Sequence, residues 1–540
     1  MPVDILLTIS CGKTKHTDDM NRFYLTLLMI LSITLAARAQ QRLTSWGDQG
    51  NGTYINPILN ADYSDPDAIR LGNKYYMVAS DFHFMGIQVL ESEDLVNWTL
   101  ISKVYDRIDF PEYENNERYG GGSWAPALRY HNGKFYVYFC TPEEGLFMSE
   151  ATDPRGPWTP LHNVVNIAGW EDPCPFWDED GQAYLGRSKV GAGPIIIHKM
   201  SEDGRTLLDE GQTVYTGPVA EGTKIHKYDG YYYLSIPEGG VDCGWQTILR
   251  SKNIYGPYEK KVVLEKGMTY INGPHQGSIV DTPEGEWWFL HFQQYNSIGR
   301  VVHLQPMHWK DGWPVIGVDQ DMNGICEPVL SWRKPDWKEG TGKLPAHSDE
   351  FNSNELGLQW QFNHNPVDGE WSLTEKKGCL TLNALQSDSF WSAKNSITQK
   401  SMGYLGEFTV KMDFSDFIDG NHAGLACMGN TNHQIGVRKV NGKVQIYMGN
   451  DSENIMISES INGKIVYLRL YLDGISQNYS FAYSVDNKTF IPLGDSFEVN
   501  FGYWKGIRPA LFCYNTEAKG GKVHFDWARY DILDHLNTEL

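Results

Sequence analysis

A short pattern, a turn signal followed by an aromatic strand-like run, recurs five times between residues 65 and 316. The turns lie at residues 73, 133, 181, 230 and 285, so consecutive copies are 60, 48, 49 and 55 residues apart. Asn-Gly and Asp-Gly pairs between apolar runs are strong hairpin signals. All-β repeats of about fifty residues predict a β-propeller, here with five blades over residues 40–320. An irregular array of β-sandwiches is the alternative.

The fifty-residue period stops after residue 320. Residues 321–348 contain Trp332, Trp337 and a glycine-containing stretch, and we interpret them as a linker. Short strand-like runs return from residue 349 to 540, and no long helical periodicity occurs anywhere. This pattern predicts an all-β chain whose second domain is a two-sheet sandwich. Because the linker is aromatic rather than rich in Gly and Ser, we expect the sandwich to pack against the propeller.

Residues 1–39 have the pattern of a secretory signal, with the true start at Met20. Arg22 precedes an apolar run from Phe23 to Ala37, and a small-x-small cleavage site follows at residues 37–39. The run is short for a membrane span, although a buried helix or an anchor is the alternative. We therefore expect a secreted or periplasmic protein without a membrane anchor after removal of the signal.

Charge and cysteine content exclude several classes of protein. The net charge of −21 disfavours a nucleic-acid or anionic-membrane partner. Beyond the signal region seven cysteines remain, an odd number without a C-x-x-C pair, which argues against a disulfide framework or a zinc site. Cys140, Cys427 and Cys513 lie in apolar strand-like runs, so we expect buried free thiols there.

A propeller brings the innermost strand of every blade to one axis, so residues that begin these strands meet at one end of it. The segments that begin the inner strands of blades one, three and four carry Asp65, Asp172 and Glu221. Blades two and five offer Trp124 and His275. Each carboxylate has an ordinary alternative interpretation, as a turn cap or as a solvated charge at a strand end.

With these motifs the chain resembles family 43 of the glycoside hydrolases, the β-xylosidase and α-L-arabinofuranosidase group. The resemblance covers about residues 55–320. It rests on Asn56-Pro57-Ile58-Leu59, Asp65-Pro66-Asp67, Trp124-Ala125-Pro126, Asp172-Pro173, Glu221-Gly222, Gly273-Pro274-His275 and Gly299-Arg300. The later part resembles the concanavalin-like jelly roll that follows the propeller in many such enzymes. The chain departs from the family in having Asp67 where Ser is frequent and Gln276 where Gly is frequent.

The resemblance implies an inverting glycoside hydrolase that releases xylose and/or arabinofuranose from plant hemicellulose oligosaccharides. Such chemistry needs a base that activates water and an acid that protonates the leaving oxygen. The resemblance assigns Asp65 as the general base and Glu221 as the general acid. Asp172 would orient Glu221 and raise its pKa by like-charge repulsion.

Four further residues are expected to bind substrate. Arg300 would donate to sugar hydroxyls, unless it forms a surface ion pair. Trp124 and Phe82 would wall the sugar site, unless they are plain blade core. His275 would lie near the propeller axis, where it could hold water or a metal ion, unless it is a satisfied core histidine.

No cofactor is required by this chemistry, and the sequence leaves open a Ca²⁺ ion at the propeller axis or in the sandwich. We find no acidic loop with a calcium-ligand spacing. Two other functions fit the same fold: an endo-arabinanase, which needs an open cleft, and a non-catalytic glycan-binding propeller. The retention of all three carboxylates argues against the binding protein.

Overall fold

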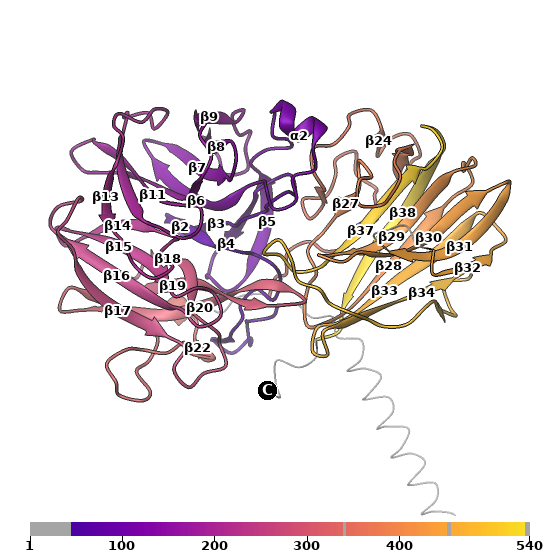
Figure 1. Ribbon diagram of the computed structural model, residues 1–540. Helices are drawn as coiled ribbons and strands as arrows, with labels where there is room; N and C mark the ends of the chain where they lie inside the picture. Colours follow the sequence, from indigo (N-terminus) through magenta and orange to yellow (C-terminus); the bar gives the residue numbers. More distant parts are fainter. Residues whose placement is uncertain (1–44, 338–341, 451–454, 535–540) are drawn as a thin grey trace, which may run out of the picture. The chain divides into compact units, whose positions relative to one another are not determined.

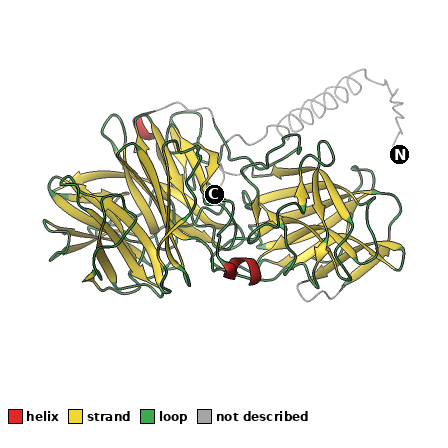
Figure 2. Ribbon diagram, turned by 90° about the horizontal axis from the view of Figure 1, so that it is seen from above, coloured by secondary structure: helices red, strands yellow, loops and turns green. Residues whose placement is uncertain are grey.

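The computed structural model describes residues 45–337, 342–450 and 455–534 (Figure 1). The predicted signal region and Met20 lie outside the described residues. Strands make up nearly all the regular structure described, and helix is confined to α2 (Pro111–Asn115) and the 3-10 turn η1 (Pro335–Trp337) (Figure 2). The predicted all-β class is confirmed. No helix in the described ranges is long and apolar enough to cross a membrane.

Five four-stranded antiparallel sheets follow one another along the chain, which confirms the five-bladed propeller. The first strand of each blade is the innermost, because first strands of neighbouring blades contact one another in the pairs β2–β6, β6–β10, β10–β14 and β18–β2, and β18 also contacts β15 and β16 of blade four. Blades one and two hold β2 (Asp67–Leu71), β3 (Lys74–Val78), β4 (Gln88–Ser92), β5 (Trp98–Lys103), β6 (Trp124–His131), β7 (Lys134–Thr141), β8 (Gly145–Ala151) and β9 (His162–Val165). Blades three to five hold β10 (Trp170–Trp177), β11 (Ala183–Lys189), β12 (Ile195–Met200), β13 (Gln212–Tyr215), β14 (Lys224–Tyr228), β15 (Tyr231–Glu238), β16 (Trp245–Ser251), β17 (Glu259–Glu265), β18 (His275–Asp281), β19 (Trp287–Tyr295), β20 (Gly299–Lys310) and β21 (Trp313–Ile316).

The hairpins that join first and second strands explain the repeated turn signal. In blades two and four the turn residues Asn132, Gly133, Asp229 and Gly230 have φ of 47°, 80°, 47° and 75°. Left-handed backbone at both central residues is the type I′ hairpin, which favours Asn-Gly and Asp-Gly. The second strands are buried on both faces, as in β7, because each blade packs between its neighbours. Hence these strands are aromatic-rich runs rather than alternating ones.

The ring closes between blades five and one. Arg70 on β2 pairs with Asp281 on β18, with 2.5 Å between Nη2 and Oδ2. The chain ahead of blade one also adds to blade five, where Leu59 bridges Val302. In addition, β1 (Thr53–Ile55) pairs with β22 (Ser331–Arg333). The segment interpreted as a linker therefore contains a strand that returns to the beginning of the described chain.

The second domain is a β-sandwich of two eight-stranded sheets, as predicted. In β33 the buried residues Val466, Leu468, Leu470 and Leu472 alternate with more exposed ones, as a strand with one face on a core requires. One sheet contains β23 (Gln361–Phe362), β26 (Leu385–Gln386), β27 (Ile397–Thr398), β29 (Asn421–Met428), β30 (His433–Val440), β31 (Lys443–Asn450), β32 (Ile457–Ser460) and β37 (Arg508–Asn515). The other contains β24 (Trp371–Ser372), β25 (Leu380–Asn383), β28 (Leu405–Asp413), β33 (Ile465–Asp473), β34 (Asn478–Ser484), β35 (Ile491–Pro492), β36 (Phe497–Glu498) and β38 (Lys522–Ile532).

Buried ion pairs join the sandwich to the propeller. Asp81 of blade one is 1% exposed and lies 3.1 Å from Lys400 Nζ and 3.7 Å from Arg508 Nη2, both of the sandwich. Burial raises the pKa of Asp81, but the nearby cations outweigh it and bring this pKa to about 2. Lys505 of the sandwich lies 3.5 Å from Asp62 of the propeller. These contacts agree with the expectation that the sandwich packs against the propeller, since buried charges need their partners.

The cysteines of the described residues are all free thiols. Cys140, Cys427 and Cys513 are buried, as predicted, and Cys243 is exposed. Burial raises the pKa of the Cys140 and Cys427 thiols well above the ordinary value, so both stay protonated and inert near neutral pH.

Candidate active site

A cavity of about 700 Å³ lies at the end of the axis where the inner strands begin. All seven site residues predicted from the sequence line it: Asp65, Phe82, Trp124, Asp172, Glu221, His275 and Arg300. Within the cavity, His275 Nε2 lies 3.0 Å from Glu221 Oε1. The propeller topology therefore brings residues from five blades into one site.

A repeated backbone irregularity aims these side chains. At matching positions in the five blades, Asp65, Ala125, Asp172, Gly222 and Gln276 have φ of 56°, 37°, 53°, 61° and 43°. The strand register shifts at the positions in β6, β10 and β18. A β-bulge of this kind re-aims a side chain, so consecutive residues can face the same side. Hence neighbouring pairs such as Trp124 and Ala125 both line the cavity.

Asp65 is held by three donors. Its Oδ2 accepts hydrogen bonds from the hydroxyls of Ser64 (2.9 Å) and Ser80 (2.5 Å), and its Oδ1 accepts from Arg300 Nη1 (3.2 Å). Arg300 Nη1 also donates to Ser64 Oγ (2.9 Å), and the backbone N–H of Ala125 donates to Ser80 Oγ (2.6 Å). Both hydroxyl protons are therefore free to point at Asp65. The carboxylate acts as an acceptor in a fixed orientation.

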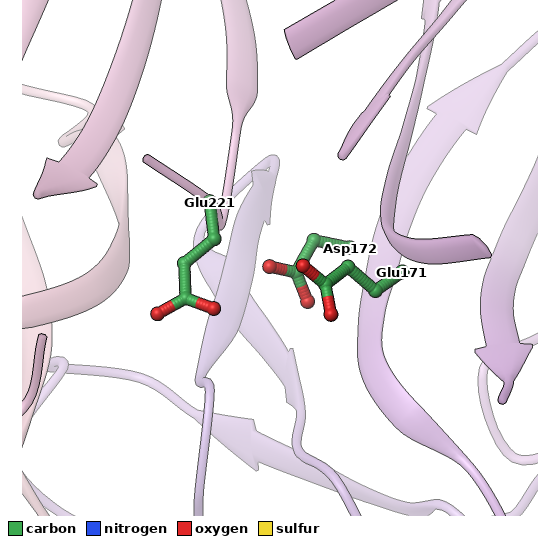
Figure 3. Close-up of side chains that lie close together, drawn as sticks. All are labelled: Glu171, Asp172 and Glu221. Atoms are coloured by element: carbon green, nitrogen blue, oxygen red, sulfur yellow. The ribbon is translucent and has the colours of Figure 1, made fainter. Parts of the chain in front are cut away.

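Three more carboxylates, Glu171, Asp172 and Glu221, form a cluster, which we call the acidic trio (Figure 3). One ligating oxygen from each lies within 4.8 Å of those of the other two. Asp172 Oδ2 accepts from the backbone N–H of Gly222 (2.6 Å), which links blades three and four. Glu171 Oε1 accepts from the backbone N–H of Ala192 (2.9 Å). Close carboxylates in a buried site cannot all ionise.

The pKa values of the acidic trio shift in different directions. Burial, and next the charges of Glu171 and Glu221, raise the pKa of Asp172 well above its ordinary value. Burial is also the main cause that raises the pKa of Glu171 to about 7. Glu221 differs: burial raises its pKa, but the hydrogen bond and charge of His275 and the charge of Arg300 outweigh burial, so this pKa is lowered.

This differs from the expectation that Asp172 raises the pKa of Glu221. The physical reason is His275, whose Nε2 lies 3.0 Å from Glu221 Oε1. The sequence could not show that contact, because the two residues belong to different blades. Like-charge repulsion is present, but it acts mainly on Asp172, the most enclosed carboxylate of the acidic trio.

Aromatic side chains wall the cavity, and two of them come from the sandwich. Phe82 and Trp124 lie 6.4 Å apart between ring centroids. Trp504 of the sandwich stacks on Phe82 at 5.7 Å and meets Trp124 edge-on at 5.0 Å. Phe501 also lines the cavity. Trp504 is 44% exposed, so an apolar ring remains available to a ligand.

Comparison with known proteins decides the family. Residues 54–314 match the family model of glycosyl hydrolases family 43, and residues 348–531 match the beta xylosidase C-terminal concanavalin A-like domain. The chain belongs to family 43 of the glycoside hydrolases. The concanavalin-like form of the sandwich is confirmed by the second match.

Individual relatives of this family 43 protein agree. A putative beta-xylosidase from Xylanibacter ruminicola is 54% identical over 474 residues, which are 88% of this chain and 89% of that protein. A non-reducing end alpha-L-arabinofuranosidase from Bacteroides ovatus is 31% identical over 69% of this chain and 73% of that protein. A solved bifunctional GH43-CE structure from Bacteroides eggerthii is 31% identical, with a TM-score of 0.79, over 88% of this chain and 63% of that chain. The chain is thus a glycosidase that acts on a carbohydrate.

Sequence reasoning missed several residues of this family 43 site. Glu171 had an available signal, since it directly precedes Asp172 at a strand start. Phe501 and Trp504 had none, because they lie far along the chain in another domain. Asp67 has a structural role: it is fully buried and pairs with Arg129 at 2.7 Å.

Two groups within the described residues have the ligand types and spacing for a metal ion. One is the acidic trio, and the other is Asp319, Asp321 and Glu327. Neither group includes His275 or a residue of the sandwich.

Proposed function

We propose that this family 43 glycosidase is an exo-acting, inverting β-xylosidase / α-L-arabinofuranosidase. Its substrates would be plant hemicellulose oligosaccharides outside the cytoplasm, in the periplasm or the medium. The observation that carries the proposal is a single cavity that is lined by both Asp65 of blade one and Glu221 of blade four. An inverting reaction needs two such carboxyl groups about 6.5–9.5 Å apart, with space for water between.

Asp65 serves as the general base in this proposal. Its three partners all donate to it, so its own oxygens stay acceptors, which is the state that removes a proton from water. Arg300 also lines the cavity, and in this proposal its guanidinium donates to sugar hydroxyls as well.

Glu221 serves as the general acid in this proposal. Substrate binding is what brings its carboxyl group into the protonated form that an acid needs. Without substrate, His275 lowers the pKa of Glu221. A leaving-group oxygen that enters between these two side chains removes the hydrogen bond to His275. Burial then dominates and raises this pKa, so that Glu221 holds the proton it must donate. Glu171 and Asp172, with raised pKa values, keep further protons close by.

The aromatic wall supports exo action. Trp504 projects from the sandwich onto Phe82 of the propeller, so residues of both domains bound one side of the cavity. An endo-acting enzyme needs a cleft open at both ends to admit the middle of a polysaccharide. A cavity walled in this way favours the end of a chain, which gives single sugars as products.

Both xylose and arabinofuranose remain within the proposal. The named relatives include a putative beta-xylosidase at 54% identity and an alpha-L-arabinofuranosidase at 31% identity. The higher identity favours xylosidase as the main activity.

The test is turnover of an aryl β-xyloside and an aryl α-L-arabinofuranoside, with proton NMR of the first sugar formed. We expect release of single sugars, a higher kcat/KM for the xyloside, and an inverted anomer. Retention at the first turnover would refute the assigned roles. Binding of oligosaccharides without turnover would indicate a glycan-binding protein instead.

A further inference from the structure

The loop between β21 and β22 contains a second acidic cluster, outside the active-site cavity. Asp319, Asp321 and Asn323 occupy alternate positions, Gly324 follows directly, and Glu327 comes three residues later. Oxygen side chains at positions one, three and five with Gly at six are the spacing of a calcium loop. The expectation that no acidic loop has this spacing is therefore wrong. The last acidic residue stands at position nine rather than twelve, which hides the pattern.

The backbone of this loop, residues 319–327, wraps around its own side chains. The backbone N–H of Gly324 donates to Asp319 Oδ2 (3.1 Å), that of Asn323 to Asp321 Oδ1 (3.0 Å), and that of Ile325 to Asn323 Oδ1 (2.7 Å). Each of these bonds leaves lone pairs unused, since a carboxylate has about four and an amide oxygen two. Gly324 has φ of 90°, a conformation that a side chain would strain.

Glu327 provides evidence for a bound cation that does not depend on the spacing of the loop residues. It is only 1% exposed, and its Oε2 accepts from the backbone N–H of Gln320 (2.7 Å), but its Oε1 has no hydrogen-bond partner. Its carboxylate lies within 4.8 Å of those of Asp319 and Asp321. None of the ion pairs between described residues involves these three. A buried carboxylate with an unpaired oxygen among like charges is costly, and a bound cation removes that cost.

We propose that residues 319–327 bind a Ca²⁺ ion. The ligands are side-chain oxygens of Asp319, Asp321, Asn323 and Glu327, together with the backbone carbonyl of Ile325 at position seven. Water completes the six to eight oxygens that Ca²⁺ takes. An all-oxygen set in an irregular loop favours Ca²⁺ over the smaller Mg²⁺, which demands near-ideal octahedral geometry. It also disfavours Zn²⁺, which prefers nitrogen and sulfur.

The location of the loop indicates a structural role. Val318 and Glu327 form an antiparallel bridge at the end of blade five. The carbonyl of Cys326 accepts from the backbone N–H of Glu265 (3.0 Å) on β17, the outer strand of blade four, and Asn323 Nδ2 donates to the carboxylate of Glu265 (2.9 Å). An ion here would therefore fasten the outer strands of two blades at the point where the chain leaves the propeller.

The test is calcium titration of the full-length protein after treatment with EDTA, followed by calorimetry and by thermal unfolding. We expect one ion per chain, a rise in Tm with about 1 mM Ca²⁺, and weaker binding of Mg²⁺. Asp321→Asn and Glu327→Gln keep the size of the side chain but lose a charge, and each should weaken calcium binding about tenfold or more. Asp311→Asn is the matched control, since it is an exposed residue of the same blade with φ of 52°, which Asn tolerates.

Three results would overturn the site. The first is no heat of binding and no change in Tm at about 1 mM Ca²⁺. The second is unchanged calcium affinity in both charge-removing variants with normal folding by circular dichroism. The third is loss of calcium binding in Glu171→Gln instead, which would locate the ion in the acidic trio.

Discussion

Removal of the Glu221 carboxyl group should separate substrates by their leaving group. Glu221→Gln preserves the shape of the side chain and a polar atom for His275, whose Nε2 lies 3.0 Å from Glu221 Oε1 in the unmodified protein. What is lost is the proton. A natural oligosaccharide leaves as an alkoxide and needs that proton, whereas dinitrophenolate is stable without it.

The expected loss of rate in each variant follows from the role of the residue that is changed. General acid catalysis contributes about 10²–10⁴ in rate, or roughly 2.7–5.4 kcal/mol of activation free energy. Glu221→Gln should lose about that much on xylo-oligosaccharides and less than about tenfold on the dinitrophenyl glycoside. Asp65→Asn removes the base that every substrate requires, and it leaves Arg300 and two serine hydroxyls without their carboxylate. It should be slow on both substrates.

The assay is kcat/KM of the wild type and both variants on xylobiose and on the dinitrophenyl xyloside, with thermal unfolding as the control for folding. The ratio of the two substrates is the decisive quantity, because a fold defect lowers both rates together. Equal losses on both substrates in Glu221→Gln, together with retained activity of Asp65→Asn on the activated one, would show that the roles are reversed.

Three other changes have expected outcomes. His275→Ala removes the contact that lowers the pKa of Glu221, so this pKa rises, the acid stays protonated to higher pH, and the alkaline limb of the kcat/KM profile moves up; an unmoved limb would contradict the pairing. Trp504→Ala should raise KM for oligosaccharides about tenfold through lost stacking, with little change in Tm because the ring is 44% exposed. Lys400→Met leaves Asp81 with one partner fewer and should cost about 3 kcal/mol of stability, measured by thermal unfolding. In the wild type the pKa of Asp81 falls from 3.8 to about 2, so its contribution to stability is present above about pH 4 and is lost as the pH falls through 2, which melting curves at acidic pH can check.

The propeller could be predicted from the sequence because its signals are local. Turn pairs such as Asn132-Gly133 and Asp229-Gly230 require left-handed backbone, and the structure has it at those residues. The fifty-residue period then sets the number of blades, and the ring topology implies that strand starts meet at one end. Asp65, Asp172 and Glu221 could thus be placed in one cavity before any coordinates were known.

What the sequence did not reveal depends on distance along the chain. Trp504 reaches the cavity from the second domain and lies more than one hundred residues beyond Ile316, where the last propeller strand ends, and no local pattern records that contact. The pKa values of the acidic trio could not be predicted from the sequence either. They depend on burial and on the contact with His275, not on the spacing of these residues along the chain.

The sequence by itself determined the all-β class, the five blades, the resemblance to the family and three of the four carboxylates that line the cavity, because hairpin turns, strand periods and motif residues are properties of neighbouring positions. Only the tertiary structure decided in which direction the pKa of each carboxylate shifts, that the sandwich supplies part of the wall, and that Glu327 lies buried beside Asp319 and Asp321. The physical reason is that desolvation and Coulomb interactions depend on separation in space, which the order of residues does not fix.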